Sequence, residues 1–286
     1  MKLAAFTHRG TNQIGVVNAA CTHVRPIAGV ADMIELIGRF DQFKRDLKPD
    51  ASIAIDDVQL RAPIPTPRRN IFCVGKNYSD HAREFSHSGF EAGAVRGAEI
   101  DDYPAVFSKG PNTVVGPHDD VQLHAAMTAS VDYEAELAVV IGTAGTNIAA
   151  DRAYEHVFGY TIVNDVTARD RQKNHKQWFL GKTLDTFCPM GPWIVTADEV
   201  DPENLEVSCW VNRERRQHAN TRDLIFDIPN LIQTISAGLT LTPGDIIATG
   251  TPAGVGIGFT PPRFLKKDDV VTIEISSIGK IENRFV

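Results

Sequence analysis

The stretch SVDYEAELAVVIG, residues 130–142, carries three acids at alternate positions and then becomes wholly apolar. Side chains on a β-strand alternate between its two faces, so Asp132, Glu134 and Glu136 share one face. Tyr133 and the apolar residues at positions 135, 137, 139 and 141 share the other. Beyond Glu136 the acidic face itself turns apolar, at positions 138 and 140. The stretch therefore predicts a strand that enters a buried region with its acids at the mouth.

Carboxylates on alternate residues of a strand repel each other. Their roots lie about 6.5 Å apart, so ionising both costs about 2–3 kcal/mol at an effective dielectric constant of about 20. A protein can protonate one acid, hydrate both, or place a cation between them. Carboxylate oxygens suit Mg²⁺, Mn²⁺ or Ca²⁺ and not zinc. The pattern alone leaves two interpretations open, a divalent-metal site and a solvent-exposed strand edge.

Composition narrows the class of protein. The chain has 286 residues, of which 43% are hydrophobic, so we expect one dominant domain with an appendage. A net charge of −7 without a Lys/Arg cluster argues against nucleic acid as a partner. The apolar runs are too short to span a bilayer, and the first residues do not form a signal peptide. The cysteines, at positions 21, 73, 188 and 209, have no metal-binding spacing, which favours a reduced, cytoplasmic setting.

A stiff connector divides the chain. The segment RAPIPTPR, residues 61–68, carries three prolines, each of which disfavours helix in the residue before it. We therefore predict a small N-terminal α/β domain over residues 1–66 and a catalytic domain over residues 67–286. In the first, strands near 2–7 and 13–19 precede a helix over 30–47. The apolar face of that helix carries Leu36, Phe40, Phe43 and Leu47.

The larger domain is rich in predicted strands. They fall at residues 71–74, 105–107, 113–115, 137–141, 160–163, 193–195, 205–211, 246–249 and 270–275. One later helix is predicted, with Asp227 as its cap, Pro229 in its first turn and Gly238 at its end. Because strands and helices do not alternate regularly, the fold class is α+β, mainly β, a sandwich or rolled mixed sheet.

The segment NYSDHAREF, residues 77–85, contains a possible general base. If it is helical after Asp80, His81 and Glu84 lie three residues apart and can meet. A carboxylate beside an imidazole orients it and raises its basicity, as a general base requires. An ordinary surface helix pair is the alternative. Residues 86–102, which follow, have the composition of a mobile lid or of a plain surface loop.

Three other features allow a functional and a plain interpretation. Lys182 lies among aromatic and aliphatic neighbours, which suits a desolvated, inward-pointing lysine. Asp165 either belongs to a site or caps a helix over residues 166–173. The loop TGTPAGVGIG, residues 249–258, lacks the lysine of a phosphate-binding loop, so we reject a nucleotide site. Its backbone N–H groups could still hold a carboxylate.

Six segments together resemble, in order, the motifs of the fumarylacetoacetate hydrolase family. The first segment contributes Asn77, Tyr78, His81 and Glu84. The other five are FSK (107–109), DYEAE (132–136), NDVTARD (164–170) with Gln172, GKTLD (181–185) and ATGTPAGVG (248–256). The resemblance covers about residues 70–260, which is about two thirds of the chain. It implies a mixed β-sandwich roll with Mg²⁺ or Mn²⁺ at its centre, and a homodimer. It also implies Glu134, Glu136 and Asp165 as metal ligands, with Asp132 in a supporting role.

The chain departs from the family's tyrosine-breakdown enzymes in two ways. Those enzymes carry a larger N-terminal barrel and a further metal-binding acid just upstream of the histidine. Here the N-terminal unit has about 65 residues, and Val74 stands in the place of that acid. The chain therefore resembles the small single-copy branch of the family. That branch includes acylpyruvate hydrolases, oxaloacetate decarboxylases, and isomerases or hydrolases of dioxo sugar acids.

These pieces predict a metal-dependent hydrolase that cleaves a C–C bond in a 2,4-dioxo acid of the acylpyruvate type. The metal would polarise the 2-oxo group and neutralise the departing pyruvate enolate. His81, oriented by Glu84, would activate water, and Lys182 would stabilise the enolate. The residues expected to bind the rest of the small 2-oxo acid substrate are Lys109, Gln172 and Thr251.

Other functions use the same residues. The same enolate forms in oxaloacetate decarboxylation, and an isomerase of the 2-hydroxyhepta-2,4-diene-1,7-dioate type is a further alternative. The His81–Glu84 pair favours hydrolysis, because it can activate water. A non-catalytic β-sandwich binding protein would explain the fold, but it leaves the lysine, the histidine pair and three acids without a task.

Overall fold

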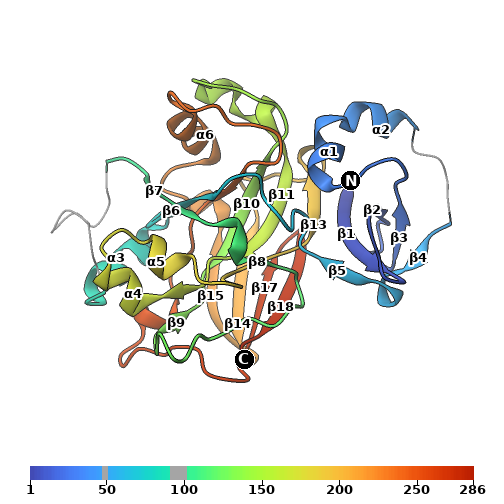
Figure 1. Cartoon of the computed structure of the whole chain (residues 1–286). Coiled ribbons are helices and arrows are strands. Elements are labelled where there is room, and N and C mark those ends of the chain that lie inside the picture. Colours follow the sequence, from blue (N-terminus) through green and yellow to red (C-terminus); the bar gives the residue numbers. More distant parts are fainter. Residues whose placement is uncertain (47–50, 91–101) are drawn as a thin grey trace.

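A computed structural model describes residues 1–46, 51–90 and 102–286. In these ranges one mixed sheet runs across the molecule and includes strands from both sides of the proline-rich connector (Figure 1). Its strands, in order, are β4 (Ile53–Ala54), β3 (His23–Pro26), β2 (Thr11–Val17), β1 (Lys2–His8), β13 (Cys188–Thr196), β11 (Val157–Asn164), β10 (Ala135–Ile141), β16 (Ile246–Ala248), β6 (Ile71–Gly75) and β7 (Ala105–Lys109). Two more join its side, β5 (Gln59–Arg61) on β1 and β8 (Val114–Val115) on β13.

A four-stranded sheet packs against the first. Its order is β15 (Glu214–Asn220), β14 (Glu206–Val211), β17 (Val270–Ile275) and β18 (Gly279–Arg284). Val139 of β10 and Ile162 of β11 lie in one buried apolar cluster with Val207 of β14 and Ile273 of β17. Two sheets that share a core in this way form a sandwich. The predicted fold class, α+β and mainly β with a mixed β-sandwich roll, is confirmed.

Strand β10 is buried on both faces, as its sequence predicts. Leu137 and Val139 point into the core between the two sheets. Ala138 and Val140 belong to a second apolar cluster, which also contains Ile194 of β13. Both sets follow from the period-two alternation of a strand. The central strand therefore carries its acidic end into the interior of the protein.

The described ranges contain six α-helices. They are α1 (Met33–Gly38), α2 (Phe40–Asp46), α3 (Ser79–His87), α4 (Arg169–Asn174), α5 (Phe179–Lys182) and α6 (Ile228–Ser236). Helix α6 is the predicted one, and the Asp227 side chain accepts from the Asn230 N–H at 2.8 Å. The expectation of only one later helix was wrong, because α3 and α4 carry few apolar residues and α5 has only 4 residues. These three lie together at one end of the roll (Figure 1).

The N-terminal residues are continuous with the main sheet. Lys2 and Leu3 of β1 pair with Val195 and Ile194 of β13. The predicted helix over 30–47 is instead two helices that meet at Arg39, and Leu47 lies outside the described residues. The division into domains 1–66 and 67–286 stays a prediction. No helix in the described ranges has both the length and the apolar character needed to cross a membrane.

Candidate metal centre and active site

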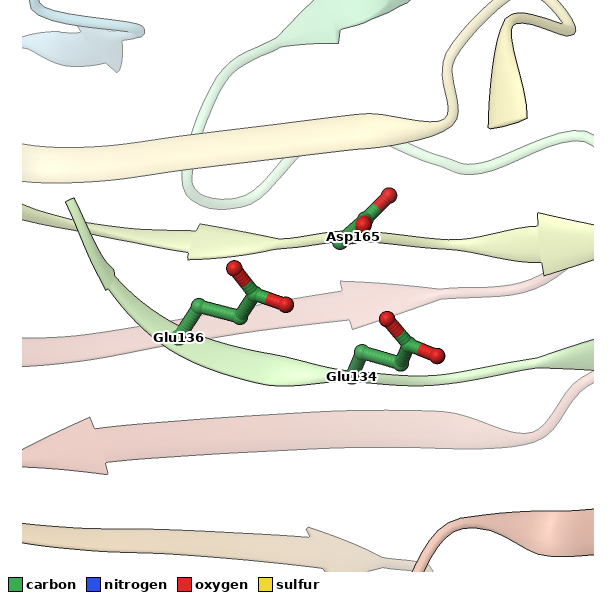
Figure 2. Close-up of side chains that lie close together, drawn as sticks. All are labelled: Glu134, Glu136 and Asp165. Carbon is green, nitrogen blue, oxygen red and sulfur yellow. The ribbon is translucent and has the colours of Figure 1, made fainter. Parts of the chain in front are cut away.

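The three acids of the predicted metal site meet because β10 and β11 pair side by side. Glu136 belongs to β10, Glu134 lies just before it, and Asp165 directly follows β11. Ala135 pairs with Asn164, and the Asp165 N–H donates to the Glu134 carbonyl oxygen at 2.9 Å. Carboxylate oxygens of the three acids lie within 4.8 Å of one another, and all three residues are buried. Figure 2 shows the two glutamates on one strand segment and the aspartate on its neighbour.

Three buried cations neutralise part of this acidic trio. The Lys182 ammonium donates to Glu134 Oε2 and Asp165 Oδ2, each at 2.7 Å. The Lys109 ammonium lies 2.7 Å from Asp165 Oδ1. Arg169 Nη2 lies 2.6 Å from Glu134 Oε1. Burial alone raises the pKa of Glu134, but Lys182 and Arg169 together lower it to about 2. Glu134 is therefore ionised at neutral pH.

Glu136 is the acid of the trio that no ion pair neutralises within the described part of the chain. Among the residues that the structure describes, its Oε2 accepts only the Gly250 N–H, at 2.9 Å. Burial, together with the nearby Asp165 and Glu134, raises the pKa of Glu136 well above its ordinary value. A divalent cation among the three acids would supply the missing positive charge. Since the donors are all carboxylate oxygens, the residues fit Mg²⁺ or Mn²⁺.

Asp132, the first acid of the motif, has partners of its own. Arg169 Nε donates to it at 2.9 Å. The Gly256 and Ile257 N–H groups donate to it at 2.6 and 3.1 Å. Because the same arginine also reaches Glu134, Asp132 fixes the guanidinium beside the trio. These contacts support the expected supporting role of Asp132.

The histidine and glutamate of α3 do form a pair. His81 Nδ1 lies 3.2 Å from Glu84 Oε2, and only 4% of His81 is exposed. Glu84 also accepts the Gly254 N–H at 3.1 Å. An ionised Glu84 accepts from a protonated Nδ1, which leaves Nε2 as the nitrogen that can exchange a proton. This geometry suits a general base and not a solvated surface pair.

One cavity is lined both by His81 and by the two glutamates of the acidic trio. Its lining includes His81, Glu134, Glu136, Gln172, Lys182 and Thr251. The cavity measures about 20 Å³, which holds about one water molecule. A ligand larger than water can enter only if side chains here move. The Lys182 ammonium, which bridges two of the acids, is one group that has to yield space.

Aromatic rings form one wall of this cavity. The Trp178 ring centroid lies 5.1 Å from that of Phe107 and 5.9 Å from that of Phe85. Lys182 Nζ lies 4.8 Å from the Phe107 ring centroid, and only 2% of Lys182 is exposed. A Cβ on Gly75 would lie 2.4 Å from the Trp178 ring, so this close approach requires glycine. The wall desolvates Lys182, as its neighbours in sequence predict.

Of the predicted substrate-binding residues, Gln172 and Thr251 line the cavity and Lys109 does not. Lys109 Nζ donates to the Val166 carbonyl oxygen at 2.9 Å and to the Lys182 carbonyl oxygen. It thus ties together the segments that carry the acids and the lysine. Its expected contact with substrate stays a prediction.

Two cationic residues without a predicted role also line the cavity, Arg169 and Lys76. Arg169 stands in the motif NDVTARD, but nothing in its spacing shows that β12 (Thr167–Ala168) pairs with β9 (Val131–Asp132) and brings it to Asp132. The same pairing excludes Asp165 as a helix cap, since α4 begins only at Arg169, after Ala168. Of the predicted lid, residues 91–101 lie outside the described residues.

Comparisons with known proteins agree on a family. The model of the family described as fumarylacetoacetate (FAA) hydrolase C-terminal matches residues 70–286. A Bacillus subtilis protein, oxaloacetate tautomerase YisK, is 53% identical over 232 residues, which cover 81% of this chain and 74% of that protein.

Solved structures extend the similarity to the whole chain. A fumarylacetoacetate hydrolase from Exiguobacterium antarcticum has a TM-score of 0.84 at 41% identity, covering 100% of this chain and 99% of that one. A maleylpyruvate hydrolase from Sphingobium sp. SYK-6, in complex with manganese(II) and pyruvate, has a TM-score of 0.79 at 34% identity, with the same coverage. That relative binds a divalent metal, and this chain has a buried acidic trio.

The predicted C–C hydrolysis of an acylpyruvate was wrong. The relative with 53% identity is an oxaloacetate tautomerase, which agrees with the oxaloacetate and isomerase alternatives. The reason is chemical: hydrolysis and tautomerisation both need a polarised 2-oxo group and a proton-transfer base. His81 and Glu84 can move a proton to or from water or carbon, so their presence does not favour hydrolysis.

Proposed function

This chain belongs to the fumarylacetoacetate hydrolase family of enzymes, and on that premise we propose that it is a metal-dependent oxaloacetate tautomerase. It would interconvert the enol and keto forms of this small 2-oxo diacid. One observation carries the proposal: a buried histidine paired with Glu84, a buried lysine and the two glutamates of the acidic trio line one cavity. The choice of oxaloacetate as the substrate is inferred from the similarity to YisK.

The proposed cofactor is Mg²⁺ or Mn²⁺ held by Glu134, Glu136 and Asp165. When bound, it would polarise the 2-oxo group and so acidify the protons on C3. Arg169 and Gln172 face the same cavity and hydrogen-bond to each other at 3.2 Å. A guanidinium beside an amide can bind a substrate carboxylate through several N–H donors. These two residues would therefore orient the diacid.

Ketonisation moves one proton from oxygen to carbon. The enol hydroxyl would release its proton to water as the substrate binds, and the Lys182 ammonium would donate a hydrogen bond to the resulting oxygen anion. Protonated His81 would then deliver a proton from Nε2 to C3, with Glu84 stabilising the charged imidazole until that moment. One proton leaves oxygen for water and one passes from His81 to carbon, and His81 then regains a proton from water. The keto acid therefore forms without a change in composition, and the histidine is restored.

Tautomerisation breaks no C–C bond and needs no water at C4. The aromatic wall supports this, because Phe107 and Trp178 close one side of the cavity to water. We also propose a homodimer and a cytoplasmic location, as expected from the sequence. The choice between Mg²⁺ and Mn²⁺ belongs to this proposal too, since carboxylate ligands accept both.

Proton exchange at C3 tests the proposal. Oxaloacetate is incubated in D₂O with protein and Mg²⁺ or Mn²⁺, and deuterium at C3 and pyruvate are followed by NMR. We expect the protein to accelerate deuterium entry while pyruvate appears only at the protein-free rate. Acceleration of pyruvate release alone would make the enzyme a decarboxylase and overturn the proposal.

A further inference from the structure

The loop over residues 249–258, which we call the glycine loop, uses its backbone to hold carboxylates of the protein itself. Its N–H donors pair as Gly250 with Glu136, Gly254 with Glu84 and Gly256 with Asp132, at 2.9, 3.1 and 2.6 Å. The sequence predicts that this loop could hold a carboxylate, and the structure shows which ones it holds. One short loop thus contacts the acidic trio, the supporting aspartate and the base's glutamate.

Helix α3 rests directly on the end of this loop. Phe85 of α3 is buried in an apolar cluster with Val255 and Ile257 of the loop. Glu84, one residue earlier in the helix, points its carboxylate at the Gly254 N–H. The contact between helix and loop therefore fixes where the proton-transfer pair lies relative to the acids.

Gly258 leaves the space that Glu84 occupies. A Cβ built on Gly258 would lie 1.6 Å from Glu84 Oε1 and 2.1 Å from Glu84 Cδ. The backbone of Gly258 is not among the positive-φ glycines, so an alanine meets no backbone strain there. The obstacle is the far end of a flexible side chain, which can move. An alanine would thus displace Glu84 and leave the fold intact.

We propose that Gly258 is a positioning residue for the proton transfer. Its missing side chain lets Glu84 reach the Gly254 N–H, and Glu84 held there keeps His81 protonated on Nδ1 with Nε2 toward the substrate. This inference rests on the proposed function of His81. Gly258 neither lines the cavity nor belongs to the acidic trio, so its effect passes through Glu84.

The test is the Gly258→Ala variant, compared with Gly38→Ala. Gly38 ends α1, and a Cβ there meets nothing within 4 Å, which makes it a matched control. For Gly258→Ala we expect kcat for oxaloacetate tautomerisation to fall by about tenfold or more, up to the roughly 10²–10⁴-fold that a general acid–base group contributes. KM and the thermal stabilisation by Mn²⁺ should stay unchanged. The control variant should keep the wild-type kcat.

A double-mutant cycle separates positioning from a general structural effect. In a Glu84→Ala background the displaced carboxylate is gone, so Gly258→Ala should lower kcat by less than about twofold further. An equal loss in both backgrounds, or an unchanged kcat in the single variant, overturns the inference.

An ¹⁵N NMR measurement of the His81 tautomer keeps the inference testable apart from activity. We expect the Nδ1–H form in the wild type and in Gly38→Ala, and a mixture of tautomers in Gly258→Ala. An unchanged tautomer in Gly258→Ala contradicts the inference even if kcat falls. If the wild type lacks tautomerase activity, the proposed function fails, and the tautomer still decides whether Gly258 positions Glu84.

Discussion

The Lys182 ammonium lies 2.7 Å from Asp165 Oδ2, deep in the interior and beside two further carboxylates. The lysine therefore supplies part of the positive charge that the acidic trio requires. A divalent cation would supply charge to the same oxygens. The lysine and the metal would therefore repel each other while they bind the same carboxylates. Removing one should strengthen the binding of the other.

Replacing Lys182 with methionine should tighten metal binding and abolish activity. An ammonium and a divalent cation about 4 Å apart repel by about 8 kcal/mol at an effective dielectric constant of about 20, so removing one favours the other. We expect the Kd for Mn²⁺, measured by calorimetry, to fall by about tenfold or more. The exposed Lys267→Met is the control and should leave Kd unchanged. Weaker Mn²⁺ binding in Lys182→Met would show that the lysine supports the metal.

Glu136→Gln should remove metal binding without destabilising the metal-free protein. In the metal-free state Glu136 is a buried acid without an ion pair in the described ranges, so a neutral amide loses little. A ligand that binds only the folded state raises Tm by mass action. We expect the wild type to gain Tm with Mn²⁺ and the variant to gain none. A full Mn²⁺ shift in the variant would exclude Glu136 as a ligand.

His81→Ala should separate proton transfer from metal binding. The imidazole pairs with Glu84 and is not part of the acidic trio. Loss of a general acid–base group costs about 10²–10⁴-fold in rate, so kcat should fall by that factor. The rise in Tm with Mn²⁺ should remain. Wild-type kcat in His81→Ala would mean that another group moves the proton.

Much of the fold follows from local patterns in the sequence. Alternation along residues 132–141 predicts a strand buried on both faces, and β10 is one. Asp227, Pro229 and Gly238 predict the ends of α6. Strand β15 has no such pattern, because a polar strand at the sheet edge carries few apolar residues. This segment is a strand because it pairs with β14, and its own sequence does not encode that pairing.

The candidate site, like the fold, is predicted by local patterns only in part. Glu134 and Glu136 are paired by their spacing, and Asp165 joins them through the registry of β10 with β11. Only the resemblance to a family indicates that third acid. The burial of Arg169 depends on the pairing of two very short strands, which no local signal encodes. The reaction itself was mispredicted, since the same groups serve hydrolysis and tautomerisation.

Gly75→Ala should disturb the aromatic wall. The added methyl would lie 2.4 Å from the Trp178 ring, so the ring must shift. Overpacking of this kind costs about 1–3 kcal/mol of unfolding free energy, which urea denaturation measures. Trp178→Leu in the same chain should recover part of that loss, because it returns the space. Equal stability of Gly75→Ala and the wild type would show that the aromatic rings of the wall can shift without a loss of stability.

The most direct test of the central claim is the rate at which enol oxaloacetate disappears. The enol is added to protein with Mn²⁺, and its ultraviolet absorbance is followed with and without excess EDTA. The account predicts a protein-dependent rate that EDTA abolishes and that is lost in Glu134→Ala. A rate equal to the protein-free rate at every metal concentration would contradict it.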